Sequence, residues 1–112
     1  MTGSQRTIRL MPDYECHPLW CHGHGGEVNV SPHDPVLGLS SGLATDLEQW
    51  GDEFDATLNR DDPASSGFPT PQVADQFAER GVLLSRRLRE ELASDWVVSY
   101  FDIRVRRASP VD

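Results

Sequence analysis

The segment SGLATDLEQWGDEFDATLN, residues 41–59, carries a large apolar side chain at every third or fourth position. An α-helix repeats every ~3.6 residues, so these side chains would share one face. Ser40 or Ser41 can cap the first turn with its hydroxyl. The pattern predicts an amphipathic helix over about residues 41–59. Its buried stripe would be Leu43, Leu47, Trp50, Phe54 and Leu58, and its opposite face would be acidic, with Asp46, Glu48, Asp52, Glu53 and Asp55.

A second helix is predicted over about residues 71–93. Thr70 can serve as its N-cap, and Pro71 stands at the first helical position, where proline is well tolerated. The loop between the two helices contains Phe68, which we expect to anchor it in the core. The second helix repeats the apolar stripe of the first, with Val73, Phe77, Gly81, Leu84, Leu88 and Leu92.

Two strands flank this helical pair in the sequence, near residues 7–11 and 96–105. In the second strand we expect the face with Val97, Phe101 and Ile103 to be buried, because it is the more apolar. Residues 18–30 are rich in glycine and proline and are expected to be mostly loop, with short extended pieces at 18–20 and 27–30.

This order of elements predicts an α+β fold in which two helices pack on a sheet of two to four strands. A two-stranded sheet is marginal alone, so either residues 18–30 or a partner chain should add strands. A homodimer formed through an open sheet edge is one such arrangement. The length of 112 residues fits one domain, residues 1–112, with frayed ends at 1–6 and 107–112.

Composition excludes several classes of protein. No apolar run approaches the ~20 residues of a membrane span, and the first ten residues contain no apolar core of a secretory signal. A cytoplasmic location and no membrane contact are therefore expected. The net charge of −8 argues against a nucleic-acid partner.

The charge is unevenly distributed along the chain. All ten basic residues are arginine, and none lies between Leu10 and Asn59, a stretch with nine acidic residues. Seven of the arginines lie between Arg80 and Arg107. The two halves can neutralise each other across the fold, or an acidic surface can remain exposed and meet a basic partner.

Both cysteines and all four histidines lie between residues 16 and 33. Thiolates and imidazoles are the ligands that Zn²⁺ prefers, and a structural site needs about four of them. The four-residue gap between the cysteines is wider than in a common zinc knuckle, and no second pair follows. A disulfide and two free thiols are the other interpretations. The candidate zinc or transition-metal ligands are Cys16, Cys21, His22 and His24.

The sequence contains no phosphate-binding glycine loop and no nucleophile elbow. His17 and His22 each directly follow a cysteine, but adjacent side chains on an extended chain point apart, so neither pair indicates a catalytic dyad. An enzyme using the loop Asn59–Phe68 is a third hypothesis without a reaction to name. No catalytic residue is assigned, and a non-enzymatic role is favoured.

Three stretches resemble a group of small acidic actinobacterial proteins that have no established activity. They are IRLMPDY with Cys16, the Pro18-Leu19-Trp20 unit, and FDATLNRDDPASSGF. The resemblance would extend over roughly residues 8–105 and implies a compact domain. Within it Cys16 and the Pro-Leu-Trp unit are typical, whereas the CHGHGG run is a local variation.

The leading hypothesis is a non-catalytic, cytoplasmic interaction protein without a cofactor. It would bind a basic protein partner through an acidic surface built from the first helix and residues 13–34, as immunity proteins that cover a toxin and accessory proteins of enzymes do. A metal-binding protein is the alternative. Tryptophan is frequent at interaction hot spots, so Trp20 joins the acidic residues as a candidate. The candidate partner-binding residues are Trp20, Asp46, Asp52, Glu53 and Asp55.

Overall fold

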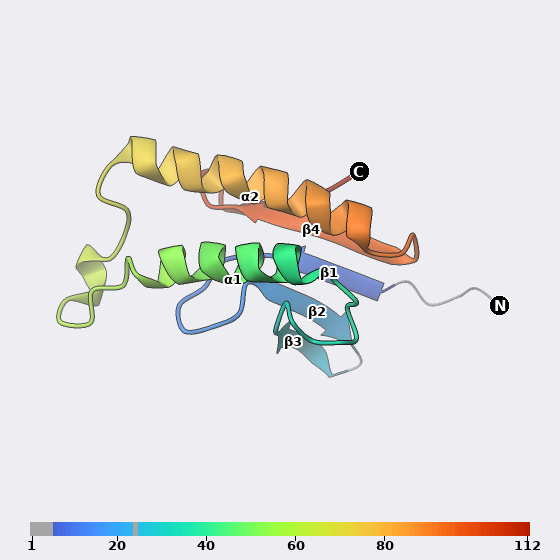
Figure 1. The fold of residues 1–112 in the computed structure, drawn as a ribbon. Helices are drawn as coiled ribbons and strands as arrows, with labels where there is room; N and C mark the ends of the chain where they lie inside the picture. Colours follow the sequence, from blue (N-terminus) through green and yellow to red (C-terminus); the bar gives the residue numbers. More distant parts are fainter. Residues whose placement is uncertain (1–5, 24) are drawn as a thin grey trace.

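A computed structural model of the chain describes residues 6–23 and 25–112. Within them, five β-strands and two α-helices are arranged with both helices on one side of the sheet (Figure 1). A short 3₁₀ turn lies in the loop between the helices. In chain order the elements are β1 (Arg6–Leu10), β2 (Leu19–Gly23), β3 (Gly26–Val30), α1 (Ser41–Asp55), α2 (Pro71–Glu91), β4 (Trp96–Asp102) and β5 (Arg107–Pro110).

The strands form one mixed sheet in the order β3-β2-β1-β4-β5. The central strands β1 and β4 are parallel, with Ile8 opposite Val98, and the other pairs are antiparallel. The predicted α+β fold with two helices on a sheet is confirmed, although the sheet has five strands rather than two to four. Residues 18–30 supply β2 and β3, so the sheet does not depend on a partner chain for its additional strands.

The C-terminal part of the sheet differs from the sequence-based expectation. Residues 107–110, expected to be frayed, form β5 and pair along β4, which is therefore not an edge strand. The buried face of β4 is also the opposite one, with Trp96, Val98 and Tyr100. The reason is that β4 ends at Asp102, whose carboxylate accepts hydrogen bonds from the Arg104 backbone and side chain. Without Ile103 and Val105, the face predicted to be buried loses two of its four apolar residues.

Both helices begin where their caps predict. The Ser40 hydroxyl accepts a hydrogen bond from the Leu43 N–H at 3.2 Å, and Thr70 does the same for Val73 at 3.1 Å. The helices end earlier than predicted, at Asp55 and Glu91 rather than near residues 59 and 93. At the end of α2, the chain turns into an extended conformation and the Arg89 guanidinium donates to the carbonyl of Ala93.

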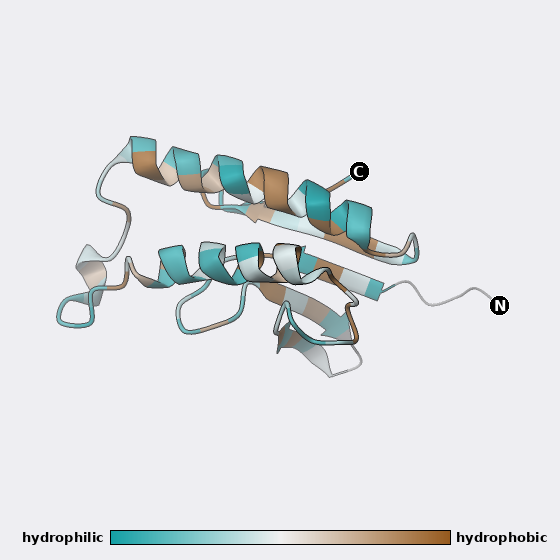
Figure 2. Cartoon of the chain, in the orientation of Figure 1, coloured by the Kyte–Doolittle hydropathy of each residue, from teal (hydrophilic) through white to brown (hydrophobic). Residues whose placement is uncertain are grey.

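The core lies between the helices and the sheet and contains buried apolar residues of both helices. Figure 2 shows hydrophobic segments alternating with hydrophilic ones along α2. Trp50 of α1 stacks on Phe77 of α2, with ring centroids 4.4 Å apart, and its indole N–H donates to the Phe77 carbonyl at 3.0 Å. Tyr100 of β4 donates its hydroxyl to the Ala78 carbonyl at 2.8 Å. Gly81 lies beside both rings, so the absence of a side chain there allows this close approach.

The loop between the helices is held by aromatic packing, as predicted. Phe68 contacts both Phe54 and Phe77, with ring centroids 6.2 and 4.9 Å apart, respectively. No helix in the described part of the chain is both long enough and apolar enough to span a bilayer.

Candidate protein-binding surface

Helix α1 presents acidic side chains on two flanks, one on each side of its buried stripe. Residues three, four or seven positions apart share a face of a helix, and the acids fall into two such sets. Asp46 and Glu53 lie on the flank beside α2. Glu48, Asp52 and Asp55 lie on the opposite flank, beside the loop that joins β1 to β2.

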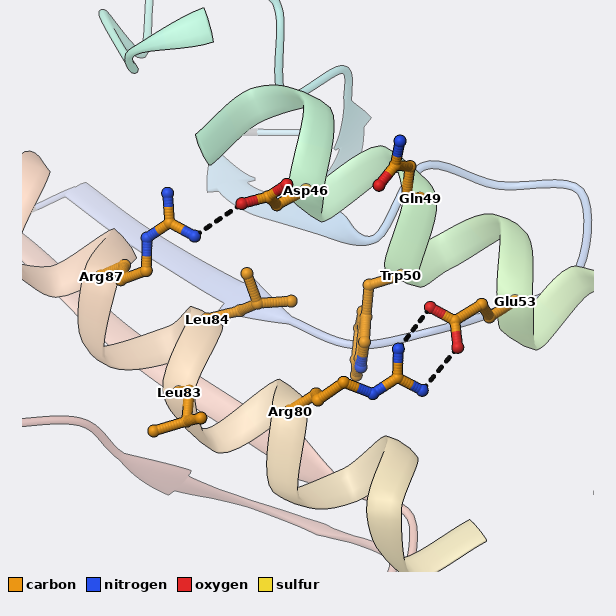
Figure 3. Close-up of a pocket in the computed structure, with 8 residues that line it drawn as sticks. All are labelled: Asp46, Gln49, Trp50, Glu53, Arg80, Leu83, Leu84 and Arg87. Carbon is orange, nitrogen blue, oxygen red and sulfur yellow. Dashed lines mark hydrogen bonds and ion pairs between the residues drawn. The ribbon is translucent and has the colours of Figure 1, made fainter. Parts of the chain in front are cut away.

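The flank beside α2 borders a cleft of about 340 Å³, hereafter the interhelical cleft (Figure 3). Asp46 accepts a hydrogen bond from Arg87 at 2.7 Å, and Glu53 binds Arg80 through both carboxylate oxygens. These are two of the cross-half charge pairs that the uneven charge distribution allows. The cleft is lined by Asp46, Gln49, Trp50, Glu53, Arg80, Leu83, Leu84 and Arg87.

The opposite flank borders a smaller cleft of about 220 Å³. We call its lining, Glu15, Cys16, His17, Glu48, Asp52 and Asp55, the acidic flank. No arginine lines this cleft within the described residues, in contrast to the interhelical cleft. Four carboxylates therefore surround one small hollow.

Local contacts fix the geometry of the acidic flank. Tyr14 stacks on Phe54 of α1 with ring centroids 4.7 Å apart, which holds the preceding loop against the helix. The Glu15 N–H then donates to the Asp55 carboxylate at 2.6 Å. His17 pairs with Glu48 at 2.9 Å through Nδ1. Arg60, from the loop after α1, pairs with the Glu15 carboxylate at the rim.

The negative charge of the acidic flank affects the pKa of the Cys16 thiol. Burial raises the pKa of Cys16, and the neighbouring Asp13, Glu15 and Asp55 carboxylates raise it further. A thiol with a raised pKa remains protonated and is a poor nucleophile near neutral pH. The acidic flank therefore presents negative charge and hydrogen-bond acceptors rather than a reactive sulfur.

The structure separates the two cysteines among the predicted metal ligands. Cys21 lies on β2 opposite Ile8 and packs against the core, whereas Cys16 lies on the acidic flank, and both are free thiols. Burial also raises the pKa of Cys21. Across residues 6–23 and 25–112, no three metal-binding side chains converge on a common point. His24, the fourth predicted ligand, lies outside the described residues.

The predicted partner-binding residues are not gathered in one place either. Asp46 and Glu53 border the interhelical cleft, and Asp52 and Asp55 belong to the acidic flank. Trp20 alternates with the core residue Leu19 on β2, so it lies on the sheet face away from the helices. Its indole N–H donates to the Met11 carbonyl at 3.1 Å. The sequence-based hypothesis places the acidic surface on the first helix and residues 13–34, a range that contains Glu15 and His17. It does not single out these two residues, because only the fold brings the loop between β1 and β2 beside α1.

A comparison with protein families finds one described as Serratia CdiI immunity protein-like, whose model matches residues 6–103. The chain belongs to this family. The matched residues include the sheet from β1 to β4, both helices and both clefts of α1, whereas β5 lies beyond the match. Membership in an immunity protein-like family indicates a protein-binding immunity function. A search among curated proteins finds no match to this chain.

Proposed function

We propose that this CdiI-like protein is a non-catalytic, cytoplasmic immunity protein that covers a basic surface of a toxin with its acidic flank. The observation that carries the proposal is the family match, combined with a cleft that has four carboxylates and no arginine in its described lining. The family match supports an immunity function, and the four carboxylates support a partner surface that is basic.

The arrangement of charges favours the acidic flank over the rest of α1. Asp46 and Glu53 already bind arginines of the same chain, so a partner would have to compete for them. On the acidic flank, Glu15 is also paired, with Arg60 at the rim, but Asp55 accepts only a backbone N–H and Glu48 faces an imidazole. Among the described residues no ion pair involves Asp52, so carboxylate charge stays available there to a cationic side chain. A concentrated negative surface accelerates encounter with a basic partner and discriminates against acidic ones.

Partner binding through this flank is compatible with the fold. Tyr14 and the Glu15–Asp55 hydrogen bond hold the loop before binding, so little conformational entropy is lost when a partner docks. Inhibition then requires only that the immunity protein cover the functional surface of the toxin. No reactive group of the immunity protein takes part.

The proposal predicts that a toxin gene lies beside the gene for this chain, and the purified toxin domain encoded there is the partner used in the test. Asp52→Arg should weaken binding about tenfold at low salt, because it reverses one charge within the flank. Glu90→Arg, an equal change of net charge on the exposed surface of α2, is the matched control. Dissociation constants are measured by calorimetry at several NaCl concentrations, where screening should weaken wild-type binding.

Equal affinities for the Asp52→Arg and Glu90→Arg variants would contradict the assignment of the acidic flank. A wild-type affinity that does not change between low and high salt would contradict it as well. Co-expression with the toxin supplies the cellular test, in which wild-type protein should restore growth and Asp52→Arg should restore less of it.

A further inference from the structure

The two helices display a charge pattern that is complementary to itself. Asp46 pairs with Arg87, and Glu53, further along α1, pairs with Arg80, which is earlier on α2. The two helices are therefore antiparallel. The two acids are seven residues apart, and so are the two arginines. Seven residues are about two helical turns, or ~10 Å. The outer face of the helix pair therefore presents two parallel ion pairs, Asp46 with Arg87 and Glu53 with Arg80. We call each pair a rung; its acid lies on α1 and its arginine on α2.

Apolar surface lies between these rungs. Leu84 and Trp50 form the floor of the interhelical cleft, and Leu83 beside them is 58% exposed, which is high for a leucine on a helix that packs in the core (Figure 3). These three apolar side chains lie between the charged side chains that form the rim of the cleft. An apolar centre surrounded by charged groups is the usual composition of a protein interface.

We propose that this face binds a second copy of the same chain, related by a two-fold axis that runs parallel to the helices. Such an axis places α1 of one protomer over α2 of its partner without a shift along the helices. Each rung then faces the same rung of the partner, so that the acid of one copy lies opposite the arginine of the other. Asp46 of one protomer faces Arg87 of the other, and Glu53 faces Arg80, so that each rung becomes a ring of four alternating charges.

Other orientations do not give this match. An axis perpendicular to the helices within the interface would place α1 over α1 and bring Asp46 near Glu53 of the other copy. Like charges at that distance repel. The rungs also have no net charge, so they offer a strongly basic toxin less attraction than the acidic flank does. Charge complementarity thus selects a second copy and a single orientation.

The resulting assembly agrees with the general physics of helix packing. Each α1 would have antiparallel neighbours, α2 of its own chain and α2 of the partner, as in an up-and-down four-helix bundle. The two sheets would lie outside, giving four layers. The acidic flank lies on the opposite side of α1 from the cleft, so a dimer leaves both copies of it accessible. The assembly could therefore hold two toxin molecules at once.

The first test is the oligomeric state of the full-length protein by sedimentation velocity over a range of concentrations. Wild-type protein should show a concentration-dependent dimer, and Leu83→Asp should raise its dissociation constant at least about tenfold by introducing charge at the apolar centre. Val36→Asp is the matched control, because Val36 is 63% exposed and lies in the loop before α1. It should leave dimerisation unchanged.

The second test uses two variants that can pair only with each other. Arg87→Asp gives a rung with two carboxylates, and Asp46→Arg gives one with two guanidinium groups. Each variant alone should be mostly monomeric, because its rung meets a rung of like charge. In an equimolar mixture the two rungs are complementary, so a heterodimer should form, visible by native mass spectrometry. Both variants lose the Asp46–Arg87 ion pair within their own chain, and that loss alone gives no reason for a heterodimer to form.

Circular dichroism of each variant first establishes that it is folded. A wild-type protein that stays monomeric at all concentrations would overturn the proposal, as would a dimer that persists in Leu83→Asp. A mixture no more dimeric than its two components would overturn the orientation. Loss of toxin binding in a monomeric Leu83→Asp variant would instead assign the cleft to the toxin. The Asp52→Arg experiment tests the acidic flank separately.

Discussion

Substituting Gly81 by alanine should strongly destabilise the fold, although alanine is the better helix former. A Cβ at this position would lie 2.2 Å from the Tyr100 hydroxyl oxygen and 2.7 Å from Cζ2 of Trp50. Both rings are buried and hydrogen-bonded to α2, Trp50 to the Phe77 carbonyl and Tyr100 to the Ala78 carbonyl. Neither ring can move away without losing its hydrogen bond, so α2 must shift from the sheet and from α1.

The size of the effect follows from these contacts. Overpacking a core costs about 2 kcal/mol. Weakening the two buried hydrogen bonds costs about 1 kcal/mol each. Replacing glycine by alanine within a helix returns about 1 kcal/mol. The expected net loss is about 3 kcal/mol of the free energy of unfolding, a large part of the ~5–15 kcal/mol typical of a domain.

Urea denaturation followed by tryptophan fluorescence measures this loss, which should lower the midpoint by about 2 M. Gly42→Ala is the control, because a Cβ there meets nothing within 4 Å. Gly51→Ala should fall between the two, since its Cβ would lie 3.2 Å from Pro18. Equal midpoints for Gly81→Ala and Gly42→Ala would refute the reasoning. Tyr100→Phe removes the nearest atom, so adding it to Gly81→Ala should cost less than the two single losses together.

Two further predictions concern a helix cap and the thiol of the acidic flank. Thr70→Ala should lower the free energy of unfolding by about 1 kcal/mol, because the Val73 N–H loses its acceptor, and urea denaturation checks this. A loss below the error of that measurement would contradict the capping role. Cys16 should react with iodoacetamide more slowly than glutathione at neutral pH, with its reactivity rising only at higher pH, because burial and nearby carboxylates raise its pKa. Peptide mass spectrometry follows the modification, and a rate equal to that of glutathione would contradict it.

Much of the fold was predictable from local patterns in the sequence. The apolar stripe around Trp50 and the caps Ser40 and Thr70 are determined by residues within a few positions of one another, and both helices follow them. The hairpin of β2 and β3 was predicted only as short extended pieces. Its glycines suggested a loop, whereas Gly26, at φ 103°, allows the backbone conformation with which β3 begins.

The errors arose where distant residues decide the structure. β5 is exposed along its length, so it shows no apolar alternation, and only its pairing with β4 makes it a strand. The buried face of β4 depends on where the strand stops, which Asp102 and Arg104 determine together. The same applies to the surface, because the sequence identifies the acids of α1 but not which of them face the arginines of α2.

The parallel pairing of β1 with β4 has a consequence for how the protein is made. Arg6–Leu10 lies at the centre of the sheet, yet its partner Trp96–Asp102 is close to the other end of the chain. Pairings between residues so distant in sequence form late, because the intervening chain must first be ordered. The central strands can pair only after synthesis has passed residue 102, so β1 stays without its parallel partner while both helices are made.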